Sequence, residues 1–303
     1  MPFHFKRKEP VTKALRRISS AQIGKIFGNL EKRDQMEAIH CARKNIKKLR
    51  ALLRLLRAEM KERDYRNAMN ALRKAAKILA APRDAHVTLQ AFDKLAAHFK
   101  NELAPKSFAG IKKLLRKNCR EKIKGFLSGN LAWNVSSVLR KMFRRVKKLT
   151  VETEGWPAIQ IGLKRSYNGG RKMQKAVLKN SAPENFHEWR KRVKDLWYHL
   201  RLLRPIWPEE MNAAADELKI LGEQLGDDHD LTMLKQFVAD HCADKNREEA
   251  EALNRLIDLR RRDLRSAALA IGARFYSEKP STFCKRIENY WNVWRGERKK
   301  KRD

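Results

Sequence analysis

Cysteine is scarce in this chain, and the four residues that occur lie far apart, at Cys41, Cys119, Cys242 and Cys284. None of them forms a CxxC pair, and their spacing fits neither a disulfide scaffold nor a zinc site. We therefore expect reduced thiols and no bound metal.

Long apolar runs are also missing. The sequence has no stretch of about 18 apolar residues that could span a membrane. Its polar start, MPFHFKRKEP, lacks the apolar centre of a secretory signal. We therefore expect a cytoplasmic protein without a membrane partner. Alternating β-branched residues are too few to build a sheet, which predicts an all-α fold.

Acidic residues are few compared with basic ones. The 303 residues contain 70 Lys and Arg but only 35 Asp and Glu, which gives a formal net charge of +35. Residues 1–150 carry +28 of this charge and residues 151–303 carry +7. Such self-repulsion indicates a polyanionic partner, and charge alone does not separate inorganic polyphosphate from nucleic acid.

Common catalytic and nucleotide-binding motifs do not occur. The segment 162–172, GLKRSYNGGRK, lacks the GKS or GKT ending of a P-loop, and the sequence has no HExxH motif. No zinc finger or aromatic RNA-recognition motif favours base reading. The acidic cluster Asp227-Asp228-His229-Asp230 could hold a metal, but a helix N-cap with salt bridges to basic helices is the simpler interpretation.

Two basic stretches share ten residues at a constant offset of 147. They are 40–57, HCARKNIKKLRALLRLLR, and 187–204, HEWRKRVKDLWYHLRLLR. Neither contains Gly or Pro, and leucines recur on the side opposite the cations, which predicts two amphipathic helices. We call them the first and second basic helices. At about 1.5 Å per residue, each cationic stripe is roughly 20 Å long.

Two more pairs of segments repeat at nearly the same offset. Residues 14–17 resemble 162–165 at an offset of 148, and residues 79–87 resemble 225–233 at an offset of 146. Three matches in the same order indicate an internal duplication. We therefore predict two helical bundles of about four to five helices each, related by a pseudo-twofold axis, with a basic cavity between them.

The predicted organisation follows from the breaks in the helical pattern. It consists of a flexible basic arm (1–10), a first bundle (11–150), a linker (151–157), a second bundle (158–294) and a basic tail (295–303).

Taken together, these motifs resemble the CHAD family, the conserved histidine α-helical domains. The resemblance rests on the two basic helices, on segment 162–172, and on the paired elements PRDAHV (82–87) and LGDDHDL (225–231). It implies paired helical bundles around a basic cavity that binds inorganic polyphosphate, often at intracellular granules. The chain departs from the family at Ala80 and Pro82, which replace a glycine-containing turn.

The resemblance implies a set of polyphosphate ligands from the two basic helices and from the first helix of each half. They are Arg17, His40, Arg43, Lys44, Lys47, Arg54, Arg165, Arg171, His187, Arg190, Lys191, Lys194, Tyr198 and Arg201. We expect a non-enzymatic binding module without a cofactor. Two alternatives stay open: a nonspecific nucleic-acid-binding protein, and a metal-dependent phosphohydrolase built on Asp228, His229 and Asp230. The oligomeric state is not predicted.

Overall fold

The computed structural model is all-α, as predicted. It describes residues 2–31, 34–104, 107–127, 131–242 and 247–296, and this part of the chain contains eleven α-helices and no strand. None of the helices in the described ranges is both long and apolar enough to cross a membrane.

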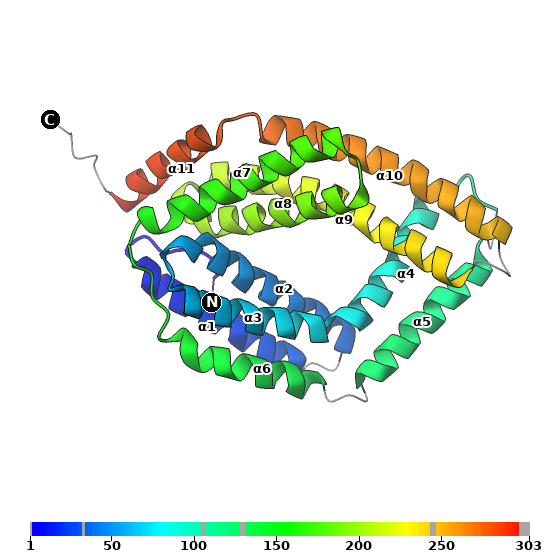
Figure 1. Cartoon of the computed structure of the whole chain (residues 1–303), viewed down its shortest axis with the longest axis horizontal. Helices are drawn as coiled ribbons and strands as arrows, with labels where there is room; N and C mark the ends of the chain where they lie inside the picture. Colours follow the sequence, from blue (N-terminus) through cyan, green and yellow to red (C-terminus); the bar gives the residue numbers. More distant parts are fainter. Residues whose placement is uncertain (1, 32–33, 105–106, 128–130, 243–246, 297–303) are drawn as a thin grey trace.

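The helices of the two halves follow one another in a repeated order (Figure 1). The first half contains α1 (Val11–Leu30), α2 (Gln35–Leu55), α3 (Glu62–Ile78), α4 (Ala80–His98), α5 (Ala109–Leu127) and α6 (Leu131–Val146). The second half contains α7 (Pro157–Lys179), α8 (Pro183–Leu203), α9 (Pro208–His241), α10 (Arg247–Phe275) and α11 (Pro280–Arg295). Short 3-10 turns, η1 (Arg57–Glu59) and η2 (Arg204–Ile206), follow α2 and α8.

Both basic helices form, as α2 and α8. The start of α2 is fixed by Asp34, whose side chain accepts hydrogen bonds from the backbone N–H groups of Met36 and Glu37. In α8 the first residue is Pro183, whose fixed φ suits the first turn of a helix. The first basic helix therefore begins five residues earlier than predicted and ends at Leu55.

The two halves differ where the chain departs from the family pattern. In the first half α3 ends at Ile78 and α4 begins at Ala80, whereas α9 runs through 34 residues without a break. Pro82 accounts for the interruption, because its ring would clash with the carbonyl of Ile78 in a continuous helix and it has no N–H to donate. The departure at Ala80 and Pro82 is thus a helix break.

Four helices form a closed ring, two from each half. α2 packs against α8, α8 against α9, α9 against α4, and α4 against α2. Figure 1 shows how these four helices lie around one another. The ring brings the first basic helix and its repeat to opposite sides of the same opening.

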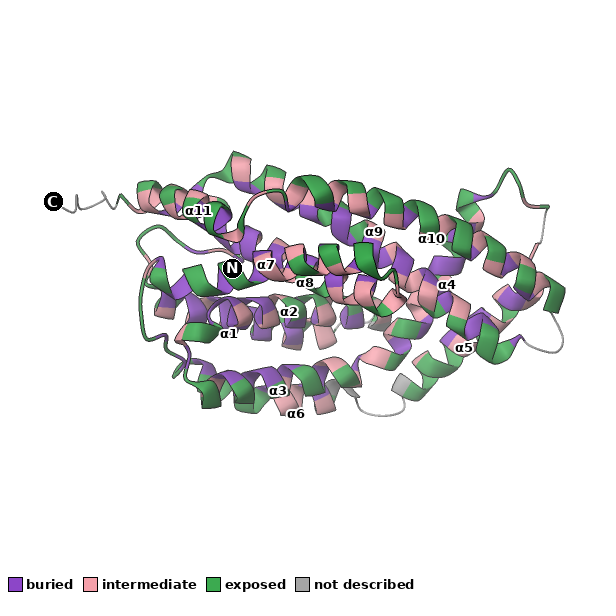
Figure 2. Cartoon of the chain, turned by 45° about the horizontal axis from the view of Figure 1, so that its top comes forward, coloured by how far each residue is buried: buried purple, intermediate pink, exposed green. Residues whose placement is uncertain are grey.

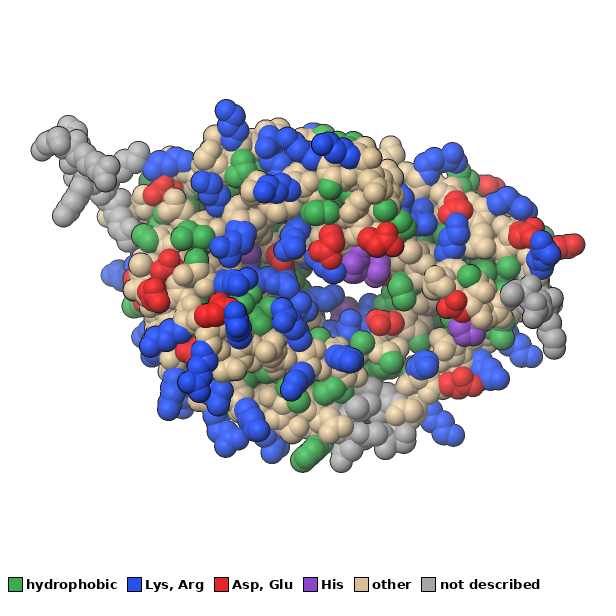
Figure 3. Space-filling view, in the orientation of Figure 1, with side chains coloured by type: hydrophobic (Ala, Val, Ile, Leu, Met, Phe, Trp, Pro, Cys, Tyr) green, Lys and Arg blue, Asp and Glu red, His purple; other side chains and the backbone are tan. Residues whose placement is uncertain are grey.

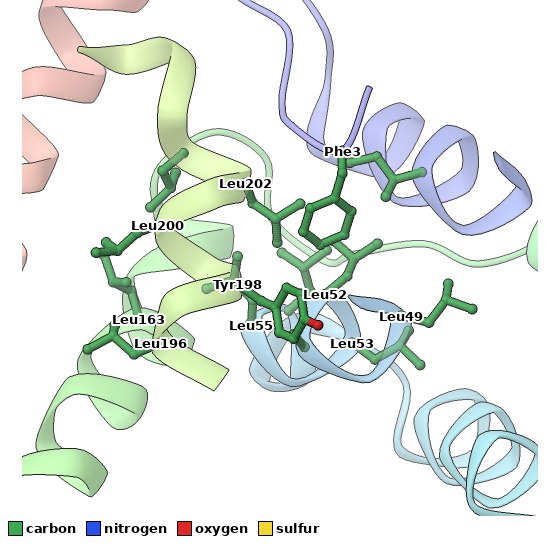
Figure 4. Close-up of a cluster of buried hydrophobic side chains, with 14 of the residues drawn as sticks. Phe3, Leu49, Leu52, Leu53, Leu55, Leu163, Leu196, Tyr198, Leu200 and Leu202 are labelled. Atoms are coloured by element: carbon green, nitrogen blue, oxygen red, sulfur yellow. The ribbon is translucent and has the colours of Figure 1, made fainter. Parts of the chain in front are cut away.

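Two hydrophobic cores flank this ring, and both contain residues from both halves. The larger core joins α1, α2 and α3 to α7, α8 and α11, and Figure 4 shows the leucines of α2 and α8 meeting within it. The smaller core joins residues 91–115 of α4 and α5 to residues 231–264 of α9 and α10. Figure 2 shows that buried residues concentrate on the inward faces of the helices. The predicted linker at 151–157 therefore does not divide the molecule into two separate cores.

Residues 2–10 are not a flexible arm, contrary to the prediction for residues 1–10. Phe5 is 1% exposed, and its backbone N–H donates to the carbonyl of Leu202 at 3.0 Å. Phe3 packs edge-on against Tyr198, with ring centroids 6.0 Å apart (Figure 4). Two aromatic side chains in an otherwise basic segment are enough to dock it on the larger core. Of the predicted basic tail (295–303), Arg295 is the last residue of α11 and Gly296 is its C-cap. Residues 297–303 lie outside the described residues.

Candidate functional site

The ring of α2, α4, α8 and α9 encloses a cavity of about 430 Å³. Figure 3 shows the molecule hollowed near its centre, with Lys and Arg side chains around the opening. The residues that line the cavity are Arg43, Lys47, Arg50, Arg54, Arg83, Asp84, Val87, His187, Arg190, Lys191, Lys194, Asp195, Tyr198, His229, Asp230 and Met233. We call this space the central cavity.

The α2 wall of the central cavity is a single stripe of cations. Arg43, Lys47, Arg50 and Arg54 follow one another at spacings of three or four residues, which places them on one face of the helix. The opposite face of α2 carries Leu49, Leu52 and Leu53, all fully buried in the larger core. The leucines therefore fix the rotation of α2, and that rotation turns the cations toward the cavity.

The α8 wall is built in the same way, and α9 makes room for its side chains. A Cβ atom at Gly222 would lie 2.9 Å from Nζ of Lys194, and a Cβ atom at Gly226 would lie 3.3 Å from Nε of Arg190. These two glycines are four residues apart on one face of α9, so they form a shallow groove along it. Lys194 and Arg190 lie in that groove.

Arg43 also donates hydrogen bonds at the break between α3 and α4. Its Nη1 atom donates to the carbonyls of Ala76 and Leu79, each at 3.1 Å. These carbonyls belong to the last turn of α3, which lacks the partners that a continuing helix would supply. Arg43 therefore joins α2 to the end of α3, just before α4 begins, while it also lines the central cavity.

Burial and neighbouring cations lower the pKa values of two lysines that line the central cavity. The pKa of Lys47 is lowered to about 8, first because surrounding protein atoms shut out water and then because Arg190, Arg43 and Lys194 lie nearby. The pKa of Lys194 is lowered to about 8, by burial and then by Arg190. Perturbed lysines of this kind gather at functional sites, because a bound anion would relieve both effects.

Several donors of the central cavity are buried without a partner among the described residues. They include Nε of Arg50, Nε of Arg190 and Nδ1 of His187. A buried polar atom without a partner costs free energy, so each of these atoms favours a ligand that can accept a hydrogen bond.

Histidine and acidic groups complete the lining on the α9 side. The rings of His187 and His229 lie 4.1 Å apart, and burial, followed by the neighbouring His187 and Arg190, lowers the pKa of His229 to about 4. Burial raises the pKa of Asp230 to about 6, although Arg190 opposes the rise. His229 is therefore neutral near pH 7, whereas Asp230 is ionised there and becomes neutral only below about pH 6.

The acidic cluster of α9 does not converge on one point. Asp228 is 1% exposed, and its carboxylate accepts hydrogen bonds from Arg261 and Arg265 of α10, each at 2.9 Å. It lies in the middle of α9, so the predicted helix N-cap is wrong, and its salt bridges reach α10 rather than the basic helices. Within the described ranges no three His, Cys, Asp or Glu side chains form a metal-binding group.

Eight of the fourteen residues implied by the family resemblance line the central cavity, and the other six lie elsewhere. Arg17 is bound to Glu9 at 2.6 Å, Nε of Arg171 donates to the carbonyl of Tyr276, and Arg201 stacks on Trp197. Arg165 lines a smaller neighbouring pocket. His40 and Lys44 are exposed on α2, outside the lining.

Sequence comparison of the two halves missed several lining residues. Arg50 shares the α2 stripe, but its counterpart at the offset of 147 is Trp197, so a search for repeated cations passes over it. Arg83 and Asp230 lie outside the basic helices and reach the cavity only because α4 and α9 close the ring. Helical spacing on α2 would have found Arg50, whereas only tertiary contacts reveal Arg83 and Asp230.

Comparison with known proteins agrees with this architecture. Residues 17–239 match the family model of the CHAD domain. The crystal structure of the CHAD domain from the plant Ricinus communis is similar, with a TM-score of 0.68 and 17% sequence identity over 89% of this chain and 96% of that chain. No curated protein matches this chain. Because the family model covers well over half of the sequence, the chain belongs to the CHAD domain family.

Proposed function

We propose that the central cavity binds inorganic polyphosphate without cleaving it and without a cofactor. The observation that supports this proposal most directly is the meeting of the two cationic stripes across one cavity. Eight Lys and Arg residues line it against three Asp residues. A linear chain of phosphates needs donors repeated along its length, and guanidinium forks and ammonium groups supply them.

The aromatic content of the lining favours polyphosphate over single-stranded nucleic acid. Proteins that bind single strands without sequence preference stack the bases on exposed aromatic rings. Among the described residues that line the central cavity, Tyr198 has the only aromatic ring besides the two histidines, and it is 5% exposed. A ligand of phosphates alone makes full use of the cations and needs no stacking surface.

Competition between polyanions over a salt series tests the proposal. We expect polyphosphate to bind more tightly than single-stranded DNA or RNA at equal phosphate concentration. The logarithm of its binding constant should fall linearly with the logarithm of salt concentration, because bound cations release counterions from the chain. Tighter binding of either nucleic acid under the same conditions would contradict the proposal and favour a nucleic-acid-binding protein.

Binding of polyphosphate should tighten as the pH falls from 7.5 to 5.5. The pKa of Asp230 is about 6, so its carboxylate is ionised at the upper pH and mostly protonated at the lower one. Loss of one negative charge from the cavity should strengthen binding of a long chain by about three- to tenfold. Titration calorimetry at both pH values measures this change.

The variant Asp230→Asn separates this carboxylate from the histidines. The variant should bind polyphosphate at pH 7.5 as tightly as the native protein does at pH 5.5. Most of the pH dependence of binding should disappear. If Asp230→Asn keeps the full pH dependence, the titrating group lies elsewhere, and His187 is the next residue to replace.

A further inference from the structure

A second, smaller pocket adjoins the central cavity on the side of α7. Its volume is about 120 Å³, and it lies where α2 and its 3-10 turn meet α7 and α8. Four arginines, Arg54, Arg57, Arg165 and Arg192, line it together with the hydroxyl-bearing Ser166. We call it the arginine pocket. Nothing in the proposed function so far makes use of it.

One ion pair separates the arginine pocket from the central cavity. Nη1 of Arg54 on α2 lies 2.6 Å and 2.7 Å from the two carboxylate oxygens of Asp195 on α8. Both residues line both spaces. A guanidinium group has five N–H donors, so Arg54 could bind a phosphate from either side while one of its nitrogens remains on Asp195. The Asp195 carboxylate therefore lies between two cationic spaces, where a phosphate of a ligand could otherwise lie.

The three cations beyond this pair are weakly held. Arg57 lies 3.8 Å from Glu62 and Arg192 lies 3.8 Å from Glu188, distances too long for hydrogen bonds. Arg165 has no ion-pair partner among the described residues. By contrast, Arg54 lies 2.6 Å from Asp195 in the wall between the two spaces. The positive charge of the arginine pocket is therefore largely available to a ligand.

A buried hydroxyl points to the same conclusion. Ser166 is 9% exposed, and its Oγ atom has no hydrogen-bond partner among the described residues. It lines the arginine pocket, where an acceptor oxygen of a ligand would satisfy it. Phosphate oxygens accept hydrogen bonds from hydroxyl groups as well as from guanidinium groups.

We propose that the arginine pocket is a second phosphate subsite, filled by a phosphate group of the same chain that occupies the central cavity. This inference rests on the proposed function. The chain passes the Arg54–Asp195 pair, and the negative charge of Asp195 opposes the phosphate that binds the other donors of Arg54. A pocket on the opposite side of the ring, between α4 and α9, is less suited, because its Lys94 is already bound to Asp227 at 2.8 Å.

Tethering explains why a chain would fill the pocket better than free phosphate. Once one part of the chain is held in the central cavity, binding at the arginine pocket becomes intramolecular and proceeds at a high effective concentration. A chain too short to reach both spaces loses this advantage. Dependence of affinity on chain length is therefore the property that identifies a second subsite.

The test compares Arg165→Glu/Arg192→Glu with Arg63→Glu/Arg262→Glu. The control changes the net charge equally at two exposed arginines that line neither space. Tripolyphosphate and chains of about 50 phosphates are titrated into each protein at fixed salt. We expect the arginine-pocket variant, relative to the control, to lose about tenfold more affinity for the long chain than for tripolyphosphate.

Each outcome of this titration has a separate meaning. If both variants lose affinity equally at both chain lengths, the second subsite is refuted and the central cavity is unaffected. If the native protein binds neither ligand, the proposed function itself is wrong. In a further titration, orthophosphate is added to each protein after saturation with tripolyphosphate. If the arginine-pocket variant loses affinity for orthophosphate only, the pocket binds free phosphate and not the chain.

Replacement of the competing carboxylate gives an independent check. Asp195→Asn keeps the shape of the side chain and removes its charge, so Arg54 becomes available to the chain. Long-chain affinity should rise about threefold. Weaker binding by a variant whose unfolding temperature is unchanged would contradict the role of Asp195 as a competing anion.

Discussion

The double variant Lys47→Glu/Lys194→Glu is expected to weaken polyphosphate binding by about a hundredfold or more. These two lysines line the central cavity, one on each basic helix, and their pKa values are lowered first by burial and then by the neighbouring Arg190. Reversal of both charges removes two donors and places two anions where phosphates would lie. Titration calorimetry with long-chain polyphosphate measures the loss.

Folding should survive this change. Each new glutamate would be surrounded by arginines, because Arg43 and Arg190 already lie close to Lys47. Circular dichroism should show unchanged helicity, and the unfolding temperature should not fall. The control, Lys122→Glu/Lys172→Glu, alters the net charge equally on exposed positions of α5 and α7. Equal binding by the two variants would show that the stripes of α2 and α8 are only solvated helix faces.

The variant Gly162→Ala should lose more than about 4 kcal/mol of unfolding free energy. Gly162 lies at the contact of α7 with α2, where an added Cβ atom would come 1.8 Å from the carbonyl oxygen of Leu55 and 2.6 Å from its carbonyl carbon. These are backbone atoms, so no side-chain rotation relieves the clash and the two helices must separate. Urea denaturation measures the change.

A second glycine in a helix serves as the control. Gly24 lies on α1 with nothing within 4 Å of an added Cβ atom. Gly24→Ala should raise the unfolding free energy by about 0.5–1 kcal/mol, because alanine restricts the unfolded chain more than glycine does. An unfolding midpoint for Gly162→Ala at or above that of Gly24→Ala would show that α2 and α7 are not in close contact.

The basic helices were predictable from sequence because their periodicity is local. Leucines and cations alternate at helical spacing within 18 residues, and the offset of 147 shows that the pattern occurs twice. The duplication also predicted a basic cavity between the two basic helices, but it gave no distances between their side chains. The position of the helix break was not predicted: it lies at Leu79, and Pro82 occupies the first turn of α4, where proline is tolerated.

Other features depend on contacts between distant segments. The docking of Phe3 and Phe5 needs the surface that α2 and α8 build together, so a short basic segment with two phenylalanines reads as an arm in isolation. The burial of Asp228 depends on Arg261 and Arg265, more than 30 residues away along the chain. In sequence alone, its neighbours His229 and Asp230 make it look like a metal ligand.

The sharing of both cores between the halves bears on how the duplication arose. A chain of one repeat would expose the leucine face of its basic helix and the faces of α4 and α5 that now pack against α9 and α10. Apolar surface of that extent requires a partner. A single repeat would therefore need a second copy of itself to cover this surface, which is the arrangement of a homodimer. Two identical subunits could not differ in the way these halves do, since α3 and α4 are separate helices whereas α9 is continuous.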